Sequence, residues 1–261
     1  MMQEELPIAT FAAPACVRKL CTGQRTSGAA PAPATAPGTG LDAELERLPD
    51  MQVFHIRMAN SAGRREEASV LIRKMYDWRG YAFEPSLLKE PSKITLYAET
   101  GGAVVATMSL WLDSPILLPA DDNFRDVLDH LRAEGRRLCE PSRLAIDKGV
   151  TKRVFAALIH ISYLYARVVH CCSDYVIEVN PRHVMFYQRM LGFESVGTER
   201  SCTRVGAPAV LLRLPLARMG DQIRTWGGRT EQQGEERSFY SYFFSASDEP
   251  GLTGRLRAGL N

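Results

Sequence analysis

Strand-like and helix-like segments alternate along residues 51–214, and their order limits this part of the chain to an α/β fold. The clearest helical pattern spans 152–170, where apolar residues recur on one face at a spacing of 3.6: Val154, Leu158, Ile161, Tyr165 and Val168. It lies between two segments with the texture of strands, 137–147 and 174–180. We therefore expect one domain in which helices flank a sheet.

The other elements of this region follow from shorter patterns. Strands are expected near 51–57, 93–99, 103–112, 193–201 and 207–214, and helices over 61–78, 121–135, 181–191 and 215–226. Gly101 and Gly102 separate two alternating runs and predict a β-hairpin. Pro141 lacks an N–H for the ladder, so a bulge is expected beside it. Asn180 is expected to cap a helix that begins at Pro181.

The two ends of the chain differ from the middle in amino-acid composition. Residues 28–40 read GAAPAPATAPGTG, which is typical of a linker, so 1–50 is expected to be a flexible segment. Residues 51–214 form the predicted domain, and 215–261 a C-terminal helix and tail. The tail carries an aromatic run at 239–244 that could dock on the domain, a partner or a membrane surface. One strand added to the sheet is the preferred interpretation.

Charge and composition exclude several classes of function. The formal net charge of +2 is too near neutral to predict nucleic-acid binding. No apolar run approaches the ~18 residues of a membrane-spanning helix, and residues 1–5, MMQEE, do not resemble a signal peptide. We therefore expect a cytoplasmic protein. Its cysteines are expected to be free thiols, because the six of them form no CxxC pair, and no metal is expected, because the five histidines lack metal-ligand spacing.

The spacing of Asn180, Tyr187 and the pair Gly192 and Phe193, together with the order of elements, resembles the GNAT acyltransferases. The resemblance implies a central mixed, splayed β-sheet flanked by helices. Acetyl-CoA-using members carry a glycine-patterned loop for the pyrophosphate between the fourth strand and its helix. Residues 147–153, DKGVTKR, keep one glycine and three basic residues there, so this protein need not bind its acyl donor through a diphosphate group.

Three segments narrow the resemblance: 136–147 (RRLCEPSRLAID), 177–194 (IEVNPRHVMFYQRMLGFE) and 78–81 (WRGY). They are similar to N-acyl amino acid synthases of the FeeM type, which are relatives of the acyl-homoserine-lactone (autoinducer) synthases. The resemblance implies transfer of a long-chain fatty acyl group from an acyl carrier protein, or CoA, thioester to the α-amine of an amino acid. The acyl-phosphopantetheine thioester is then a co-substrate, and no cofactor is bound permanently.

Amide formation requires a proton acceptor, a stabilised oxyanion and a protonated leaving thiolate. Glu140 is the predicted base; otherwise it is a structural carboxylate paired to a neighbouring arginine. Arg143 either joins Glu140 on one side of the strand through the bulge or faces outward toward the carrier protein. Tyr187 either protonates or hydrogen-bonds the leaving sulfur, or is core.

The remaining predicted positions come from the resemblance and from residue type. The oxyanion is assigned to the backbone N–H groups of Leu144, Ala145 and Ile146. The acceptor is assigned to Arg73, Tyr76, Arg79 and Tyr81. The acyl chain is assigned to apolar residues that otherwise are ordinary core: Met108, Leu110, Trp111, Phe155, Leu158 and Phe186. An acidic carrier protein and its pantetheine arm would suit a basic rim: Lys148, Lys152, Arg153 and Arg182, with Arg136 and Arg189 nearby.

Two other functions remain open on the sequence. An autoinducer synthase using S-adenosylmethionine needs further acidic residues between 81 and 113. Acidic residues do occur there, but their spacing does not match the spacing expected of that family. A non-catalytic acyl-binding protein of GNAT fold keeps an apolar tunnel and has no need of Glu140.

Overall fold

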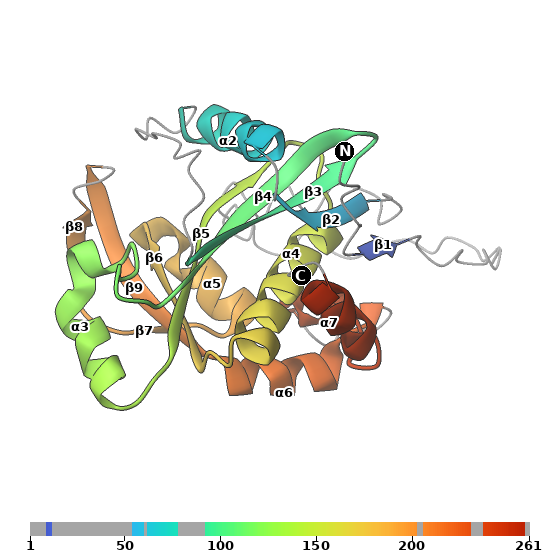
Figure 1. Ribbon diagram of the computed structural model, residues 1–261. Coiled ribbons are helices and arrows are strands. Elements are labelled where there is room, and N and C mark those ends of the chain that lie inside the picture. Colours follow the sequence, from blue (N-terminus) through green and yellow to red (C-terminus); the bar gives the residue numbers. More distant parts are fainter. Residues whose placement is uncertain are drawn as a thin grey trace, which may run out of the picture.

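The computed structural model describes residues 9–11, 54–59, 62–77, 92–202, 206–230 and 237–258 (Figure 1). The expected linker at 28–40 and the WRGY segment at 78–81 lie outside these ranges.

One mixed sheet forms the centre of the molecule. Its strands are β1 (Ala9–Phe11), β2 (Phe54–Met58), β3 (Lys93–Thr100), β4 (Ala103–Leu112), β5 (Leu138–Ile146), β6 (Asp174–Val179), β7 (Glu194–Ser195), β8 (Arg200–Cys202) and β9 (Ala207–Pro215). The order is β1-β2-β3-β4-β5-β6-β9-β7, and β8 also pairs with β9. Neighbouring strands are antiparallel except β5 and β6, which are parallel.

The parallel pair is very short, and this opens the sheet. β5 and β6 are in register only at Leu138 with Asp174 and at Cys139 with Tyr175. Beyond these positions the two strands diverge toward their carboxyl ends. The splayed mixed sheet expected from the sequence is confirmed.

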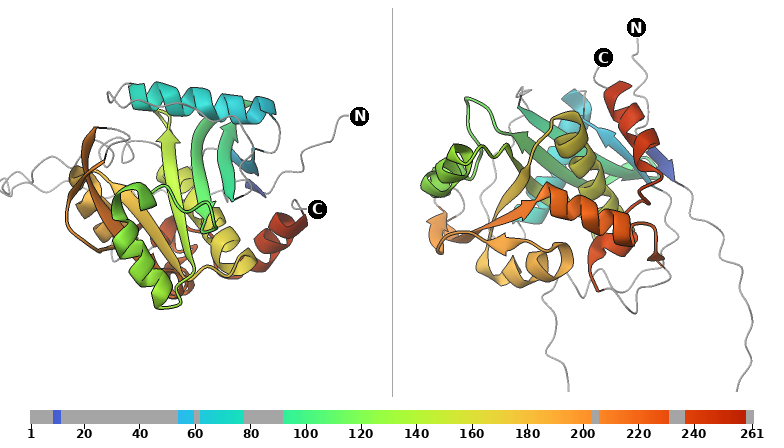
Figure 2. Two further views of the ribbon diagram at one scale, coloured as in Figure 1. Left: turned by 60° about the vertical axis from the view of Figure 1, so that its left-hand side comes forward. Right: turned by 90° about the horizontal axis from the view of Figure 1, so that it is seen from below.

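Helices cover both faces of the sheet (Figure 2). We call the face under α2 (Ala62–Asp77) and α3 (Asp121–Ala133) the α3 face. There Leu71 packs near Ala145, and Phe124 packs near Leu138 and Val176. The opposite face, the α4 face, carries α4 (Lys152–Tyr163), the π-helix η1 (Leu164–Val169), α5 (Val184–Leu191) and α6 (Leu216–Trp226), whose buried side chains share one core.

Most local predictions match the elements found. Gly101 and Gly102 adopt φ values of 57° and 84° in the predicted hairpin between β3 and β4. Asn180 caps the short 3-10 helix η2 (Pro181–His183) by accepting the backbone N–H of Arg182 at 3.2 Å. The predicted helix over 152–170 differs at its end, because the N–H of His170 reaches back five residues to Tyr165 and makes the last turn a π-helix.

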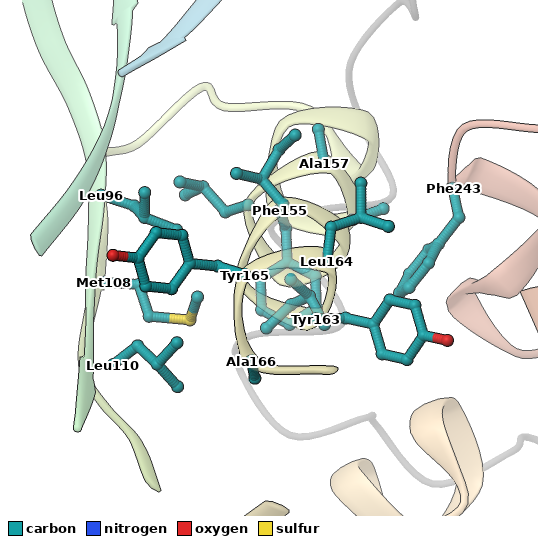
Figure 3. Close-up of a cluster of buried hydrophobic side chains, with 14 of the residues drawn as sticks. Leu96, Met108, Leu110, Phe155, Ala157, Tyr163, Leu164, Tyr165, Ala166 and Phe243 are labelled. Atoms are coloured by element: carbon teal, nitrogen blue, oxygen red, sulfur yellow. The ribbon is translucent and has the colours of Figure 1, made fainter. Parts of the chain in front are cut away.

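The aromatic run at 239–244 is not a strand, so the preferred interpretation was wrong. It forms the 3-10 helix η4 (Phe239–Tyr242), which is followed by α7 (Glu249–Ala258). Ser238 caps η4 by accepting the N–H of Tyr240. The run is apolar on every side rather than at alternate positions, and Phe239, Tyr240 and Phe243 are all buried in the core with α4. Figure 3 shows Phe243 across α4 from the sheet residues Leu96, Met108 and Leu110.

A buried histidine joins this C-terminal segment to α4. The Nδ1 atom of His160 accepts the backbone N–H of Phe244 at 3.2 Å, which leaves the proton on Nε2 to be donated to Glu249 at 3.2 Å. The imidazole is fully buried and stacks on the rings of Phe243 and Phe244. Burial lowers the pKa of His160 below its ordinary value of 6.5, against the opposing effect of Glu249.

This geometry predicts that acid weakens the fold through His160. Below pH 6.5 the unfolded state binds the proton more readily than the folded state, so the free energy of unfolding falls as the pH falls through this range. Urea denaturation at about pH 7.5 and pH 5.5 measures the loss, and His160→Gln should show a smaller pH dependence than the native chain. Equal pH dependence in the two proteins would contradict the assignment.

Gly227 ends α6 at a close approach of two backbone segments. A Cβ added there would lie 2.5 Å from the carbonyl oxygen of Phe244 and 2.6 Å from that of Ile223. Because neither backbone atom can move cheaply, Gly227→Ala is expected to lower the free energy of unfolding by about 1–3 kcal/mol. Gly254→Ala in α7 is the matched control, since its Cβ would meet nothing within 4 Å. Thermal unfolding compares the two, and equal midpoints would refute the prediction.

Candidate active site

Glu140 lies where the sheet begins to open. It is the first residue of β5 after the last pair with β6, and it is 98% buried, since only 2% of its surface is exposed. Its side chain points to the α3 face, where its Oε2 atom accepts the backbone N–H of Ala120 at 2.8 Å. Glu140 is therefore a buried carboxylate at the point where β5 and β6 begin to diverge.

A bulge follows Glu140, as the proline predicted. Ser109 of β4 is opposite Ser142, whereas Thr107 is opposite Ala145, so β5 contains one extra residue between these pairs. Arg143 lies in this bulge with φ of 52°, a left-handed conformation that is uncommon outside glycine.

The bulge returns Arg143 to the side of Glu140. The guanidinium carbon of Arg143 lies 5.8 Å from the centre of the Trp111 ring, and Trp111 is the register partner of Glu140 on β4. In a regular strand, positions three apart face opposite sides. Of the two arrangements left open by the sequence, the structure has the one in which Glu140 and Arg143 share a face.

The α3 face beside Glu140 is polar. Lys93, Trp111 and Glu140 are neighbours across three strands, and the ammonium of Lys93 lies 5.0 Å from the centre of the Trp111 ring. Two buried atoms here have no hydrogen-bond partner among the described residues, the Nε1 of Trp111 and the Oγ of Ser142. Buried polar atoms are rarely left unpaired, so these two are unusual for the interior of a protein.

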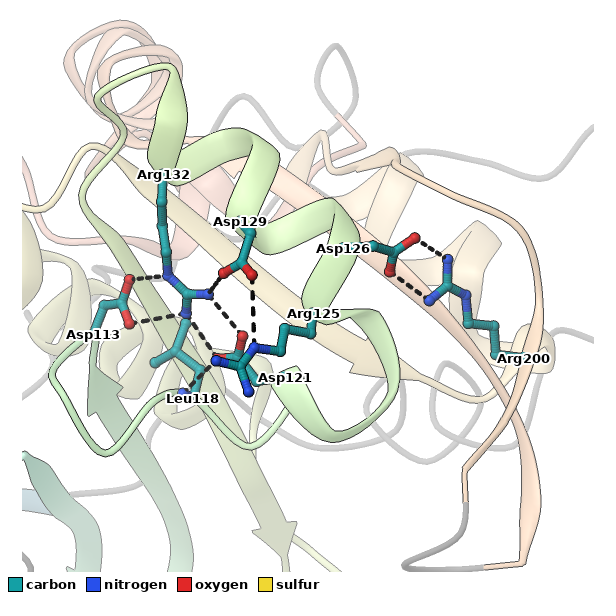
Figure 4. A network of polar contacts seen from close by, with 8 residues as sticks. All are labelled: Asp113, Leu118, Asp121, Arg125, Asp126, Asp129, Arg132 and Arg200. Atoms are coloured by element: carbon teal, nitrogen blue, oxygen red, sulfur yellow. Dashed lines mark hydrogen bonds and ion pairs between the residues drawn. The ribbon is translucent and has the colours of Figure 1, made fainter.

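A cluster of charges holds the loop that contacts Glu140 (Figure 4). Arg132 of α3 donates to Asp113 at 2.8 and 3.0 Å and to Asp121 at 2.7 Å through each of two nitrogens. Asp121 also accepts the N–H of Leu118 at 2.7 Å. These contacts fix the loop that presents the Ala120 N–H, and the carboxylates of Asp121 and Asp113 raise the pKa of Arg132 further. Sequence reasoning missed this cluster.

Of the three predicted oxyanion donors, the ladder favours Ile146. The N–H of Asp147 donates to Val105 of β4, and the pairs Ala145 with Thr107 and Ile146 with Ala106 continue the same register. Because N–H directions alternate along a strand, that of Ala145 points to β4 and that of Ile146 points away from it, toward the gap beside β6. Leu144 lies within the bulge.

Five of the six residues predicted for the acyl chain lie in one cluster on the α4 face: Met108, Leu110, Phe155, Leu158 and Phe186. Trp111 is not among them, because it follows Leu110 directly and neighbouring strand residues face opposite sides. The five side chains are buried, and the rings of Phe155 and Phe186 lie 6.2 Å apart.

Tyr187 and one unpredicted acid, Glu178, come from the part of the chain that forms β6 and α5. Tyr187 on α5 is half-buried, with its ring against those of Phe186 and Phe193. Glu178 of β6 points to the α3 face, where it accepts the side-chain amide of Asn123 at 2.6 Å. Glu178 is an acid among the otherwise apolar residues 175–179, and this is the sequence signal that could have identified it.

The predicted basic residues lie near the start of α4, with one on η2. Thr151 at the N-cap of α4 makes no side-chain cap, while Lys148 is exposed and Lys152 and Arg153 are half-buried. Gly149 has φ of 90°. Arg182 is exposed on η2. These positions leave the first N–H groups of α4 near three bases, an arrangement suited to an anion.

The acceptor residues are only partly described. Arg73 is exposed on α2. The side chain of Tyr76, and Arg79 and Tyr81 entirely, lie outside the described residues. Within the described part of the chain no helix is long and apolar enough to cross a bilayer, and no group of three or more His, Cys, Asp or Glu is placed to hold a metal ion.

Three solved structures are among those similar to this chain. The structure titled FeeM, an N-acyl amino acid synthase from uncultured soil microbes, has 26% identity and a TM-score of 0.61, with 66% of this chain and 96% of that one covered. A probable acetyltransferase from Staphylococcus epidermidis ATCC 12228 has 16% identity, coverage of 62% and 98%, and a TM-score of 0.47. The AHL synthase LasI has 14% identity, coverage of 64% and 91%, and a TM-score of 0.44.

A search of curated proteins found no match. A family model does match: that of N-acyl amino acid synthase FeeM covers residues 67–215, which is more than half of the chain and includes Glu140, the bulge and the gap. The protein has the GNAT fold that it shares with FeeM, and the family match shows that it is an acyltransferase. The chain belongs to the FeeM family of N-acyl amino acid synthases.

Proposed function

We propose that this acyltransferase joins a long-chain fatty acyl group, carried as a thioester on acyl carrier protein or CoA, to the α-amine of an amino acid. The observation that carries the proposal is the buried Glu140 carboxylate at the vertex of the gap between β5 and β6, within the region that matches the family. We also propose that 51–214 is the catalytic unit, flanked by 1–50 and 215–261, and that the protein acts in the cytoplasm.

In this proposal the amino acid binds on the α3 face. Glu140 accepts the proton of its ammonium group, directly or through one water, so that the free amine can attack. Arg143 binds the carboxylate of the acceptor, a role for which its planar guanidinium is suited, and Arg73, Tyr76, Arg79 and Tyr81 stay predicted contacts. The unpartnered atoms of Trp111 and Ser142 support the choice of this face, because an amino acid offers groups that would pair with them.

The thioester enters the gap from the α4 face. The N–H of Ile146 stabilises the oxygen of the carbonyl as the amine adds to its carbon, and Leu144 stays the other predicted donor, whereas the N–H of Ala145 points to β4. The C–N bond forms and the C–S bond breaks, Tyr187 donates a proton to the leaving sulfur, and the phenolate regains a proton, directly or through water, from the nitrogen as the amide forms. The acyl chain displaces or parts side chains of the cluster with Phe155 and Leu158, and each buried methylene contributes about 0.8 kcal/mol.

The donor's phosphate and its carrier meet the basic start of α4. Lys148, Lys152 and Arg153 surround helix N–H groups that suit the phosphate of phosphopantetheine, and Arg182 lies on η2. A basic rim also attracts an acidic acyl carrier protein and speeds its association.

Incubation with acyl carrier thioester, or with the matching acyl-CoA, and a mixture of amino acids tests the proposal. Mass spectrometry is expected to find an N-acyl amino acid, formed faster from the carrier thioester. A lactone product that needs S-adenosylmethionine would instead support an autoinducer synthase. Tight binding of the acyl donor with no product would support a non-catalytic acyl-binding protein.

Removing only the hydroxyl of Tyr187 separates its two predicted roles. If Tyr187 protonates the sulfur, Tyr187→Phe should lower kcat by about 100-fold while stability changes little, because the ring contacts remain. Steady-state kinetics and urea denaturation measure the two effects. Tyr163→Phe is the matched control, since its hydroxyl lies beside Gly220 of α6. An unchanged rate in Tyr187→Phe would leave this tyrosine as a core residue.

A further inference from the structure

A pocket separate from the gap beside Glu140 lies at the amino ends of β5 and β6, where the two strands are still paired. Its volume is about 710 Å³, which is in the usual range for sites that hold small molecules. It is lined by the loop after β4, the start of β5 and the end of η1: Ser92, Leu112, Asp113, Ser114, Pro115, Ile116, Arg136, Arg137, Leu138, His170 and Cys172. Asp113 of the cluster that holds the Glu140 loop lines it, as does Arg136 beside the predicted basic rim, but Glu140, Arg143 and Tyr187 do not.

Three polar atoms on residues that line this pocket are buried and have no hydrogen-bond partner among the described residues. They are the Oγ atoms of Ser92 and Ser114 and the Nε2 atom of His170. Ser92 is more than nine-tenths buried, with 8% of its surface exposed. Most buried polar groups are hydrogen-bonded, so three unpaired atoms on residues that line one pocket are unusual and favour this pocket as a candidate site.

The charge of the pocket favours an anion. Arg137 donates to the carbonyl of His170 at 2.9 Å, so its guanidinium lies at the wall. The Nε of Arg136 lies 3.8 Å from Glu134, near the long limit of an ion pair. The one carboxylate in the lining, that of Asp113, is already bound by two nitrogens of Arg132. Burial and the charge of Arg137 lower the pKa of His170, so its ring is neutral near pH 7.

The rest of the lining is apolar. Leu112, Pro115 and Leu138 contribute to the wall, and Ile116 is 63% exposed, which is unusual for so large an apolar residue. An inorganic anion would leave this surface in contact with water. A molecule that covers it needs a hydrocarbon part as well as a charge.

We propose that this pocket is a second ligand site, which binds a small organic carboxylate with an aliphatic body. The carboxylate accepts hydrogen bonds from the arginines and the serine hydroxyls, and the aliphatic part covers Ile116 and Leu138. The site does not depend on the proposed transfer reaction, because none of the residues assigned to proton transfer, the oxyanion, the acceptor or the acyl chain lines it.

Octanoate is a suitable probe, and the imidazole of His170 is a reporter inside the pocket. In NMR spectra of the full chain, with His170 assigned through His170→Gln, octanoate should shift the His170 ring signals in a saturable way. The ring of His160, which is enclosed by Phe243 and Phe244, should not move. Octanol and inorganic phosphate, which each supply half of the chemistry, should bind at least about tenfold more weakly.

Variants show whether the effect arises in this pocket. Arg136→Gln is expected to weaken octanoate binding at His170 by at least about tenfold, and Ser114→Ala by a smaller factor. Arg125→Gln is the matched control, since Arg125 lies on the exposed side of α3 and pairs with Asp129. The proposal is overturned if octanoate leaves His170 unmoved, if both pocket variants bind as the native chain does, or if octanol or phosphate binds as tightly as octanoate.

Discussion

Glu140→Gln is expected to lower kcat by about 100-fold to 10,000-fold, the range typical of losing a general base. The amide oxygen of glutamine can still accept the N–H of Ala120, which the carboxylate accepts at 2.8 Å, so the loop and the fold should be preserved. What the amide cannot do is take a proton from the acceptor ammonium. The KM for the acyl donor should change little, because Glu140 faces away from the cluster proposed for the acyl chain.

Single-turnover and steady-state rates measure this effect, and urea denaturation confirms that the variant is folded. Glu194→Gln is the matched control, because Glu194 is exposed and pairs with Arg218 far along the chain. A folded Glu140→Gln enzyme with near-native turnover would remove Glu140 as the base. It would leave the carboxylate as a structural partner of the loop before α3.

Phe239→Ala is expected to lower the free energy of unfolding by about 3–5 kcal/mol, the usual cost of deleting a buried phenylalanine. Phe239 is 99% buried, with 1% of its surface exposed, and its ring centre lies 4.8 Å from that of Phe155 and 5.7 Å from that of Phe186. Although the family match ends at residue 215, this side chain completes the core between α4 and α5. The C-terminal segment should therefore unfold together with the sheet.

Equilibrium urea denaturation followed by fluorescence and by circular dichroism tests both parts of this prediction. Met185→Ala is the matched control: Met185 lies on α5 beside Phe186 but is 60% exposed, and its loss should cost less than about 0.5 kcal/mol. Two separate transitions in the native chain, or a Phe239→Ala variant as stable as Met185→Ala, would show that the C-terminal segment is an independent appendage.

Features set by a few neighbouring residues were predictable from the sequence. The hairpin needed two glycines at positive φ, and Gly101 and Gly102 supply them. Asn180 caps the turn that begins at Pro181, and the proline in β5 is followed within two residues by a bulge. In each case the local backbone has one good solution, so tertiary contacts do not override it.

Features set by distant contacts were not predictable in the same way. The aromatic run at 239–244 lacks a clean period, and its structure depends on the surface that α4 offers. The cluster around Arg132 joins residues from the β4–α3 loop and α3, and surface ion pairs of similar sequence spacing are common without any such role.

The candidate site likewise has features that the sequence could predict and features that it could not. Sequence alone could name Glu140 and Arg143 but left their relative side open, because a bulge of one residue reverses every later side chain. It grouped Trp111 with Leu110, although adjacent strand residues face opposite sides of the sheet. Ser142 carries no motif, and only its position on the α3 face beside the gap reveals it.

The most direct measurement is a crystal structure with a stable conjugate of a fatty acyl amino acid and phosphopantetheine, which holds both substrates as one molecule. We predict that it passes between β5 and β6, with its nitrogen within hydrogen-bond reach of the Glu140 carboxylate or one water away from it. A conjugate seated elsewhere, or one whose nitrogen is separated from Glu140 by the sheet, would contradict the account.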